Sequence, residues 1–109
     1  MEYDTELAKR VAAIIAVRRD VTDRKMFGGI AWMLQGNMAC GVIGDEVIVR
    51  LSAEDSDRAL AEPDTRPFDM TGRRMRGFVV VGGPSIANDA GLRGWIDAGA
   101  DYASSLPPK

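Results

Sequence analysis

The chain has 109 residues, the size of one domain, and its 46% hydrophobic and 28% charged content is that of a globular protein. Its formal net charge of −2 disfavours non-specific binding to nucleic acid, because domains that hold phosphates usually carry net positive charge. The absence of histidine and the presence of one cysteine exclude Ser-His-Asp and Cys-His catalysis, a structural zinc site and an intrachain disulfide.

The first predicted element is an amphipathic helix over residues 5–19. Asp4 or Thr5 can cap its start, because a short oxygen-bearing side chain accepts hydrogen bonds from the first free N–H groups of a helix. The apolar positions follow the i, i+4, i+7, i+8 spacing of one helical stripe: Leu7, Val11, Ile14 and Ile15. A short turn over residues 21–23 should follow.

Four strands are predicted next, in residues 25–27, 30–34, 38–43 and 47–51. The turns between the last three are Gln35-Gly36-Asn37 and Gly44-Asp45, and turns of two or three such residues between apolar runs indicate hairpins. Strands joined by tight turns pair antiparallel.

The second half of the chain is predicted to add two helices and two strands. A helix begins after the cap residue Ser52 and runs through Leu60, and a closing helix begins near Asp89 after its cap Asn88. We predict a polar connection over residues 63–73 that contains an edge strand, Phe68–Met70. A strand follows over Met75–Val81, and Pro107-Pro108 ends the closing helix. The order α-β-β-β-β-α-β-β-α predicts one α+β domain over residues 1–109, an antiparallel sheet with helices packed on one face.

The stretch from Lys25 to Val42 contains the most distinctive residues. A phosphate-binding glycine loop should lead into a helix N-terminus, but Gly28-Gly29 leads from one strand into another, which favours a bend or bulge. Cys40 lies mid-strand with no local cation to activate its thiol, so we predict a small core residue.

Two groups of side chains are candidates for binding a partner. Methionines fill irregular cores and also line adaptable grooves, and core packing is the default for the five in the predicted strands: Met26, Met33, Met38, Met70 and Met75. The cluster Arg73, Arg74 and Arg76 suits an acidic partner, a phosphate or simple solvation, and in a regular strand Arg74 and Arg76 share one face. We take these three arginines, with Met26, Phe27, Gly28 and Gly29, as candidate partner-binding residues.

Small residues line one side of the closing helix: Ala90, Gly94, Ala98 and Asp101. Glycine inside a helix costs about 1 kcal/mol relative to alanine, so we expect a reason for its presence. Our hypothesis is that this side meets another backbone closely, either the sheet or a second subunit.

The run Lys25-Met26-Phe27-Gly28-Gly29-Ile30, followed by the hairpin turn and Met38, resembles the signature of the TfoX/Sxy N-terminal domain family. The similarity continues through most of the chain: Arg66-Pro67-Phe68 to Gly72-Arg73, the strand Gly77–Val81, and a closing helix with Leu92, Trp95 and a Ser-Leu-Pro-Pro-Lys tail. The resemblance implies an α+β fold like that of YgaC and the secretion chaperones. It also implies a link to competence regulators that act as transcriptional co-activators, and it supplies no catalytic residues. Those regulators carry a second, C-terminal helical domain. The 109 residues of this chain resemble only the N-terminal domain, so we expect a stand-alone member of the family.

These observations predict a non-enzymatic regulatory or protein-interaction domain that binds another protein and forms a homodimer. We expect no cofactor and no metal. We also expect no membrane contact, because no apolar run has the length of a membrane span. With no signal peptide, the cytoplasm is the expected location. The alternative is a small-molecule-binding protein or enzyme with a pocket between the sheet and the closing helix. Direct nucleic-acid binding is a third and weaker hypothesis.

Overall fold

The computed structural model describes residues 3–26, 28–70 and 72–109, and for Met70 and Arg74 it describes the backbone alone. The helices are α1 (Thr5–Ile15), α2 (Ala53–Ala59), α3 (Pro84–Ala87) and α4 (Asp89–Ser105). The strands are β1 (Val21–Met26), β2 (Gly29–Leu34), β3 (Asn37–Ile43), β4 (Glu46–Arg50), β5 (Thr65–Met70) and β6 (Arg73–Val81).

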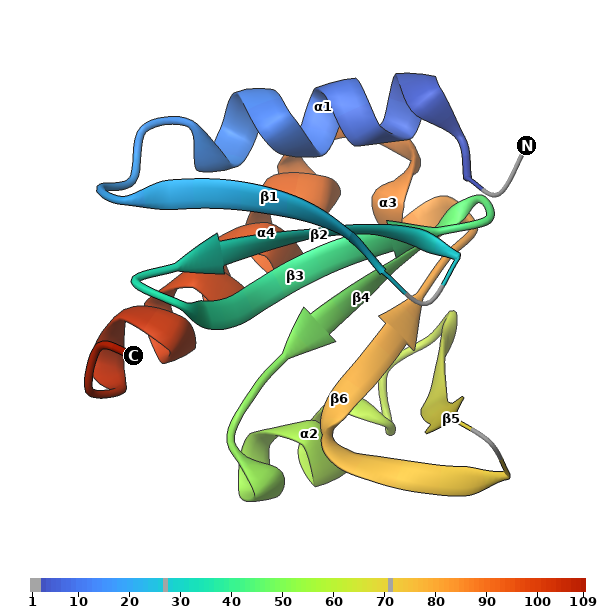
Figure 1. Ribbon diagram of the computed structural model, residues 1–109. Helices are drawn as coiled ribbons and strands as arrows, with labels where there is room; N and C mark the ends of the chain where they lie inside the picture. Colours follow the sequence, from blue (N-terminus) through green and yellow to red (C-terminus); the bar gives the residue numbers. More distant parts are fainter. Residues whose placement is uncertain (1–2, 27, 71) are drawn as a thin grey trace.

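The six strands form one antiparallel sheet in the order β1-β2-β3-β4-β6-β5 (Figure 1). Strands β1 to β4 follow one another as a meander, and β6 then pairs with β4 while β5 forms the far edge. Helix α2 lies in the connection between β4 and β5, where the Ser56 hydroxyl accepts a hydrogen bond of 3.1 Å from the Gly77 N–H of β6.

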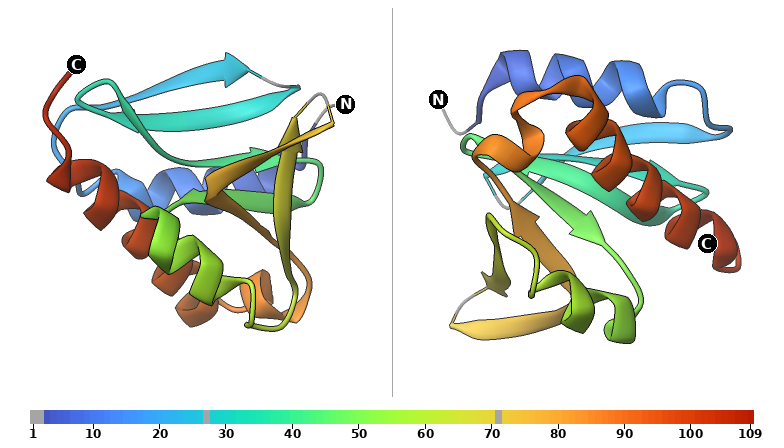
Figure 2. Two further views of the ribbon diagram at one scale, coloured as in Figure 1. Left: turned by 90° about the horizontal axis from the view of Figure 1, so that it is seen from below. Right: turned by 180° about the vertical axis from the view of Figure 1, so that it is seen from behind.

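Helices α1 and α4 cover one face of the sheet, and no helix of the described residues covers the other (Figures 1 and 2). In the left view of Figure 2, β1, β2 and the β5–β6 hairpin extend to the side away from α4. The sheet is therefore strongly curved. The prediction of an α+β domain with helices on one face is confirmed.

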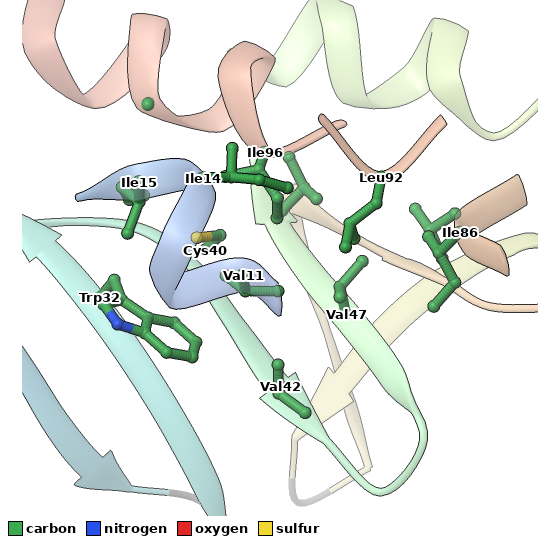
Figure 3. Packing of buried hydrophobic residues seen from close by; sticks show 14 of the residues in the cluster. Val11, Ile14, Ile15, Trp32, Cys40, Val42, Val47, Ile86, Leu92 and Ile96 are labelled. Carbon is green, nitrogen blue, oxygen red and sulfur yellow. The ribbon is translucent and has the colours of Figure 1, made fainter. Parts of the chain in front are cut away.

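The covered face carries the main core (Figure 3). Val11 and Ile15 of α1, and Leu92 and Ile96 of α4, are at most 1% exposed and pack over the strands. Burying a side chain of this size contributes roughly 1.5–3 kcal/mol each, so closing this face supplies much of the stability of the domain.

The face without helices carries a second cluster, which we call the free face. Its members come from all six strands: buried Ala31, Met38, Ile48, Phe68 and Val80, and half-buried Met26, Met33, Ile43, Met75 and Phe78. Because no second layer lies over them in the described residues, these side chains are buried by one another and by the curvature of the sheet.

Two predicted boundaries are wrong. Helix α1 ends at Ile15 rather than at residue 19, and residues 21–23, predicted as a turn, belong to β1. The turn lies earlier, where Asp20 adopts a positive φ of 57° and its carbonyl accepts a hydrogen bond from the Gln35 N–H. Val21 and Thr22 are β-branched residues that favour strands, and pairing with β2 carries the strand on through Asp23, which does not.

The elements that follow β4 also differ in part from the predicted ones. The predicted polar connection over residues 63–73 contains the whole of β5, which begins at Thr65 directly after a positive φ of 65° at Asp64. The loop predicted after β6 contains the short helix α3. The Ser52 and Asn88 caps are confirmed, because their side chains accept hydrogen bonds from the N–H groups of Asp55 and Gly91.

Candidate partner-binding surfaces

The turn between β1 and β2 explains the glycine pair. Met26 pairs with Gly29, which leaves two residues in the loop, and Gly28 has a φ of +77° that side chains rarely adopt. A Cβ on Gly29 would lie 2.1 Å from the Val42 carbonyl oxygen, so only glycine fits there. The predicted bend is confirmed, while Phe27, the remaining candidate of this motif, lies outside the described residues.

A shallow hollow of about 290 Å³ lies at this turn. It is lined by Tyr3, Lys25, Met26, Gly28 and Gly29. Tyr3 was not among the candidate residues, because it lies before the first helix in the sequence and reaches this hollow through its bridge to Gly44 at the β3–β4 turn.

The three candidate arginines of β6, Arg73, Arg74 and Arg76, have different surroundings. Arg73 is exposed at the start of β6, and Arg74 pairs with Asp69 in the ladder. Arg76 donates a hydrogen bond of 2.7 Å to Asp57 of α2, and this bond raises the pKa of Arg76. The expected strand alternation fails nearby, since Gly77 has a φ of +94° and the β5–β6 register shifts.

The methionines gather on the free face. Met26 from β1 and Met75 from β6 lie in strands near opposite edges of the sheet, and both pack against the same cluster. Met33 and Met38 belong to it as well, whereas the side chain of Met70 lies outside the described residues. The curvature of the sheet thus brings together candidate residues that are about fifty positions apart in the sequence.

Two other arginines hold elements in place. Arg18 donates hydrogen bonds to Asp101 and Asp97, which tie the end of α1 to α4, and the bond to Asp101 is the main cause of its raised pKa. Arg66 of β5 bonds to Glu46 of β4 at 2.7 Å, which raises the pKa of Arg66. Both guanidinium groups therefore have a structural partner.

Arg50 was not singled out by its sequence context. Its guanidinium carbon lies 5.7 Å from the ring centroids of both Phe78 and Tyr102, which is cation–π distance. The contact joins β4, β6 and α4, and no local pattern around Arg50 could have indicated it.

The small-residue side of α4 faces outward rather than toward the sheet. Nothing lies within 4 Å of a Cβ built on Gly94, whereas a Cβ on Gly99 would meet the Ala39 carbonyl oxygen at 2.4 Å. Close approach to the sheet therefore occurs at Gly99, a position that the hypothesis did not include.

The Gly94 side lines a groove of about 470 Å³ between α2 and α4. Its walls include Ala59, Glu62, Gly94 and Trp95. Between the sheet and the closing helix, where the alternative hypothesis places a pocket, buried side chains such as Ile96 pack against the strands.

Cys40 is fully buried beneath α1 (Figure 3). Burial raises the pKa of its thiol from 9.0 to about 12, so the thiol stays protonated at neutral pH. The prediction of a core cysteine is confirmed. Among the described residues no group of three His, Cys, Asp or Glu side chains could hold a metal ion, and no helix is long and apolar enough to cross a membrane.

A family model for the TfoX N-terminal domain matches residues 13–103. The chain belongs to this family. No curated protein and no solved structure shows a significant match to it.

In this member of the TfoX N-terminal domain family, the C-terminal tail serves the fold. Asn37 donates a side-chain hydrogen bond of 2.9 Å to the Pro107 carbonyl, and the Lys109 N–H donates one of 2.8 Å to the Gln35 carbonyl. The tail thus docks on the β2–β3 turn and satisfies the amide of Asn37, which is only 2% exposed.

Proposed function

We propose that this chain is a non-enzymatic protein-interaction domain that binds a regulatory partner, in the transcriptional setting that its family suggests. The partner binds on the free face, between the β1–β2 and β5–β6 hairpins. The observation that carries this proposal is a sheet face that holds an apolar cluster with members from all six strands and bears no helix among the described residues.

The composition of the free face suits an adaptable protein contact. Met26, Met33 and Met75 are half-buried, and unbranched thioether side chains repack easily against different apolar surfaces. Half-buried Phe78 adds an aromatic anchor of the kind enriched at interfaces.

The β5–β6 hairpin adds positive charge beside this apolar area. Arg73 is exposed, and no ion pair of its side chain is present within the described part of the chain. A partner with an apolar segment and a neighbouring carboxylate therefore matches the surface better than a nucleic acid, whose affinity would need several phosphate contacts.

The non-enzymatic part of the proposal is supported by the thiol of Cys40 and by three arginine side chains. Cys40 is buried and protonated, and Arg18, Arg66 and Arg76 are engaged with carboxylates. Within the part of the chain that the structure describes, these four groups serve packing and contacts between elements, and none of them is an activated nucleophile at the surface.

The test compares three tagged forms of the chain as baits in lysate of its own cells. The wild type is compared with Met33→Lys/Met75→Lys on the free face and with Ala13→Lys/Ala53→Lys, two exposed positions on α1 and α2. The control adds the same charge away from the free face, and thermal melts establish that both variants fold.

We expect a partner that is retained by the wild type and by the control, and lost at least tenfold by the free-face variant, because a buried lysine at an apolar contact is costly. Equal retention by both variants would place the interaction elsewhere. Failure of the wild type to retain any protein would contradict the proposal and direct attention to ligand binding in the groove between α2 and α4.

A further inference from the structure

The two edges of the sheet are built differently. In the β5–β6 pairing the Gly82 N–H bonds to the Asp64 carbonyl, so alternate residues Thr65 and Pro67 direct their peptide groups outward. Proline at such a position offers no N–H to an incoming strand, and the register shift that follows it distorts the edge further. Strand β5 is therefore a protected edge.

Strand β1 has no such protection. Its six residues pair with β2 in one unbroken register, without proline. Because the Gln35 N–H bonds to the Asp20 carbonyl in that same register, Val21, Asp23 and Lys25 direct their peptide groups away from β2. Residues 22–25 are all exposed, so these outward groups are open to a strand.

The charges along this edge are complementary to themselves. Asp23 and Lys25 lie two residues apart and share one face, opposite Trp32 and Ile30. In an antiparallel pair of two identical strands centred on Arg24, each Asp23 lies opposite Lys25 of the other copy. The same register pairs the outward peptide groups of these two residues.

We propose that two copies of this chain associate through β1, antiparallel and centred on Arg24, to form one continuous sheet across a two-fold axis. The pairing forms about four main-chain hydrogen bonds and two opposite-charge side-chain pairs. It places the two Arg24 side chains opposite each other, a like-charge contact that limits affinity.

A second copy fits this edge better than an arbitrary strand does. An edge that only repels other chains is served by charges of one sign, whereas Asp23 and Lys25 alternate in sign at the spacing that a two-fold pairing requires. A single strand pair buries a small area, so the dimer is weak and reversible. The free face stays open in it, so this inference does not depend on the proposed function.

Sedimentation velocity of the full chain over a range of concentrations tests the inference. We expect a reversible dimer that is populated by about 500 µM, as suits a small interface. Asp23→Pro removes an outward N–H without breaking the ladder to β2, and we expect it to remain monomeric with an unchanged melting profile.

Charge reversal tests the register. Asp23→Lys and Lys25→Asp each place like charges opposite one another and should weaken the dimer at least tenfold, while the double variant Asp23→Lys/Lys25→Asp should restore it. Lys9→Asp, on the exposed side of α1, is the matched control and should leave the dimer intact.

A wild type that stays monomeric at about 500 µM, the upper range for a weak small interface, would overturn the inference. So would a dimer that survives Asp23→Pro, and so would a double reversal that fails to restore association. A monomer whose capture of another protein is abolished by Asp23→Pro would assign the edge to a foreign strand rather than to a second copy.

Discussion

The two faces of the sheet are made by the same six strands and differ in how their side chains are buried. On the covered face α1 and α4 supply Val11, Ile15, Leu92 and Ile96, all at most 1% exposed. On the free face the strands bury one another, and half of the cluster remains half-exposed. The difference shows that apolar strand residues alone do not produce a second layer.

The free face is unusual for an antiparallel sheet without a second layer. Such sheets commonly alternate apolar residues toward the core with polar residues toward solvent. Here Ala31, Ile48 and Val80 are almost fully buried on the face that bears no helix among the described residues. Curvature accomplishes part of this burial, and the partner that we propose would complete it.

The largest effect on the free energy of unfolding is expected when a side chain is truncated on the covered face rather than on the free face. Ile96→Ala removes a side chain that is 0% exposed on the covered face and should lower the free energy of unfolding by about 3–4 kcal/mol. Met33→Ala on the free face should cost only about 1 kcal/mol, because its side chain is half-exposed. Urea denaturation measures both. Equal losses would mean that the two faces are packed alike.

The second prediction concerns how closely α4 sits on the sheet. Gly99→Val introduces a Cβ 2.4 Å from the Ala39 carbonyl and should cost about 3 kcal/mol, since backbone cannot yield cheaply. Its matched control, Gly94→Ala on the outward side of α4, should stabilise by about 0.5–1 kcal/mol. Thermal melts of the two variants should therefore move in opposite directions, and movement in the same direction would contradict the packing of α4.

The third prediction uses the pKa of Cys40 as a probe of the covered face. Since burial raises that pKa from 9.0 to about 12, the folded chain keeps the thiol proton at a pH where the unfolded chain loses it. The stability that this proton supplies is full below pH 9 and falls as pH rises from 9 toward 12, by about 1.4 kcal/mol per pH unit.

Urea denaturation at several pH values between 8 and 10.5, compared for wild type and Cys40→Ala, isolates this contribution from lysine and tyrosine titration common to both. The advantage of the wild type should shrink above pH 9, the unperturbed pKa of the thiol. A difference that stays constant with pH would show that the thiol is not desolvated in solution.

Local signals predicted the elements of the domain well where they were strong. The helical stripe from Leu7 to Ile15 and the Ser52 and Asn88 caps are as predicted, and so is the bend at Gly28-Gly29. Prediction failed where pairing with a neighbouring strand sets the boundary of a strand, as at residues 21–23, and where a short helix follows a glycine turn, as at Pro84. The methionines were correctly assigned to strands, but their convergence on one face was not predicted.

The sequence by itself determined the α+β class, the order of most elements, the burial of Cys40 and membership of the TfoX N-terminal domain family. These follow from periodicity, turn chemistry and a short motif, which act over a few residues. The tertiary structure alone decided which face α1 and α4 cover, that Gly99 rather than Gly94 meets the sheet, and that β5 but not β1 carries a proline and a register shift. Those properties depend on curvature and on contacts between residues far apart in the chain, which no local pattern records.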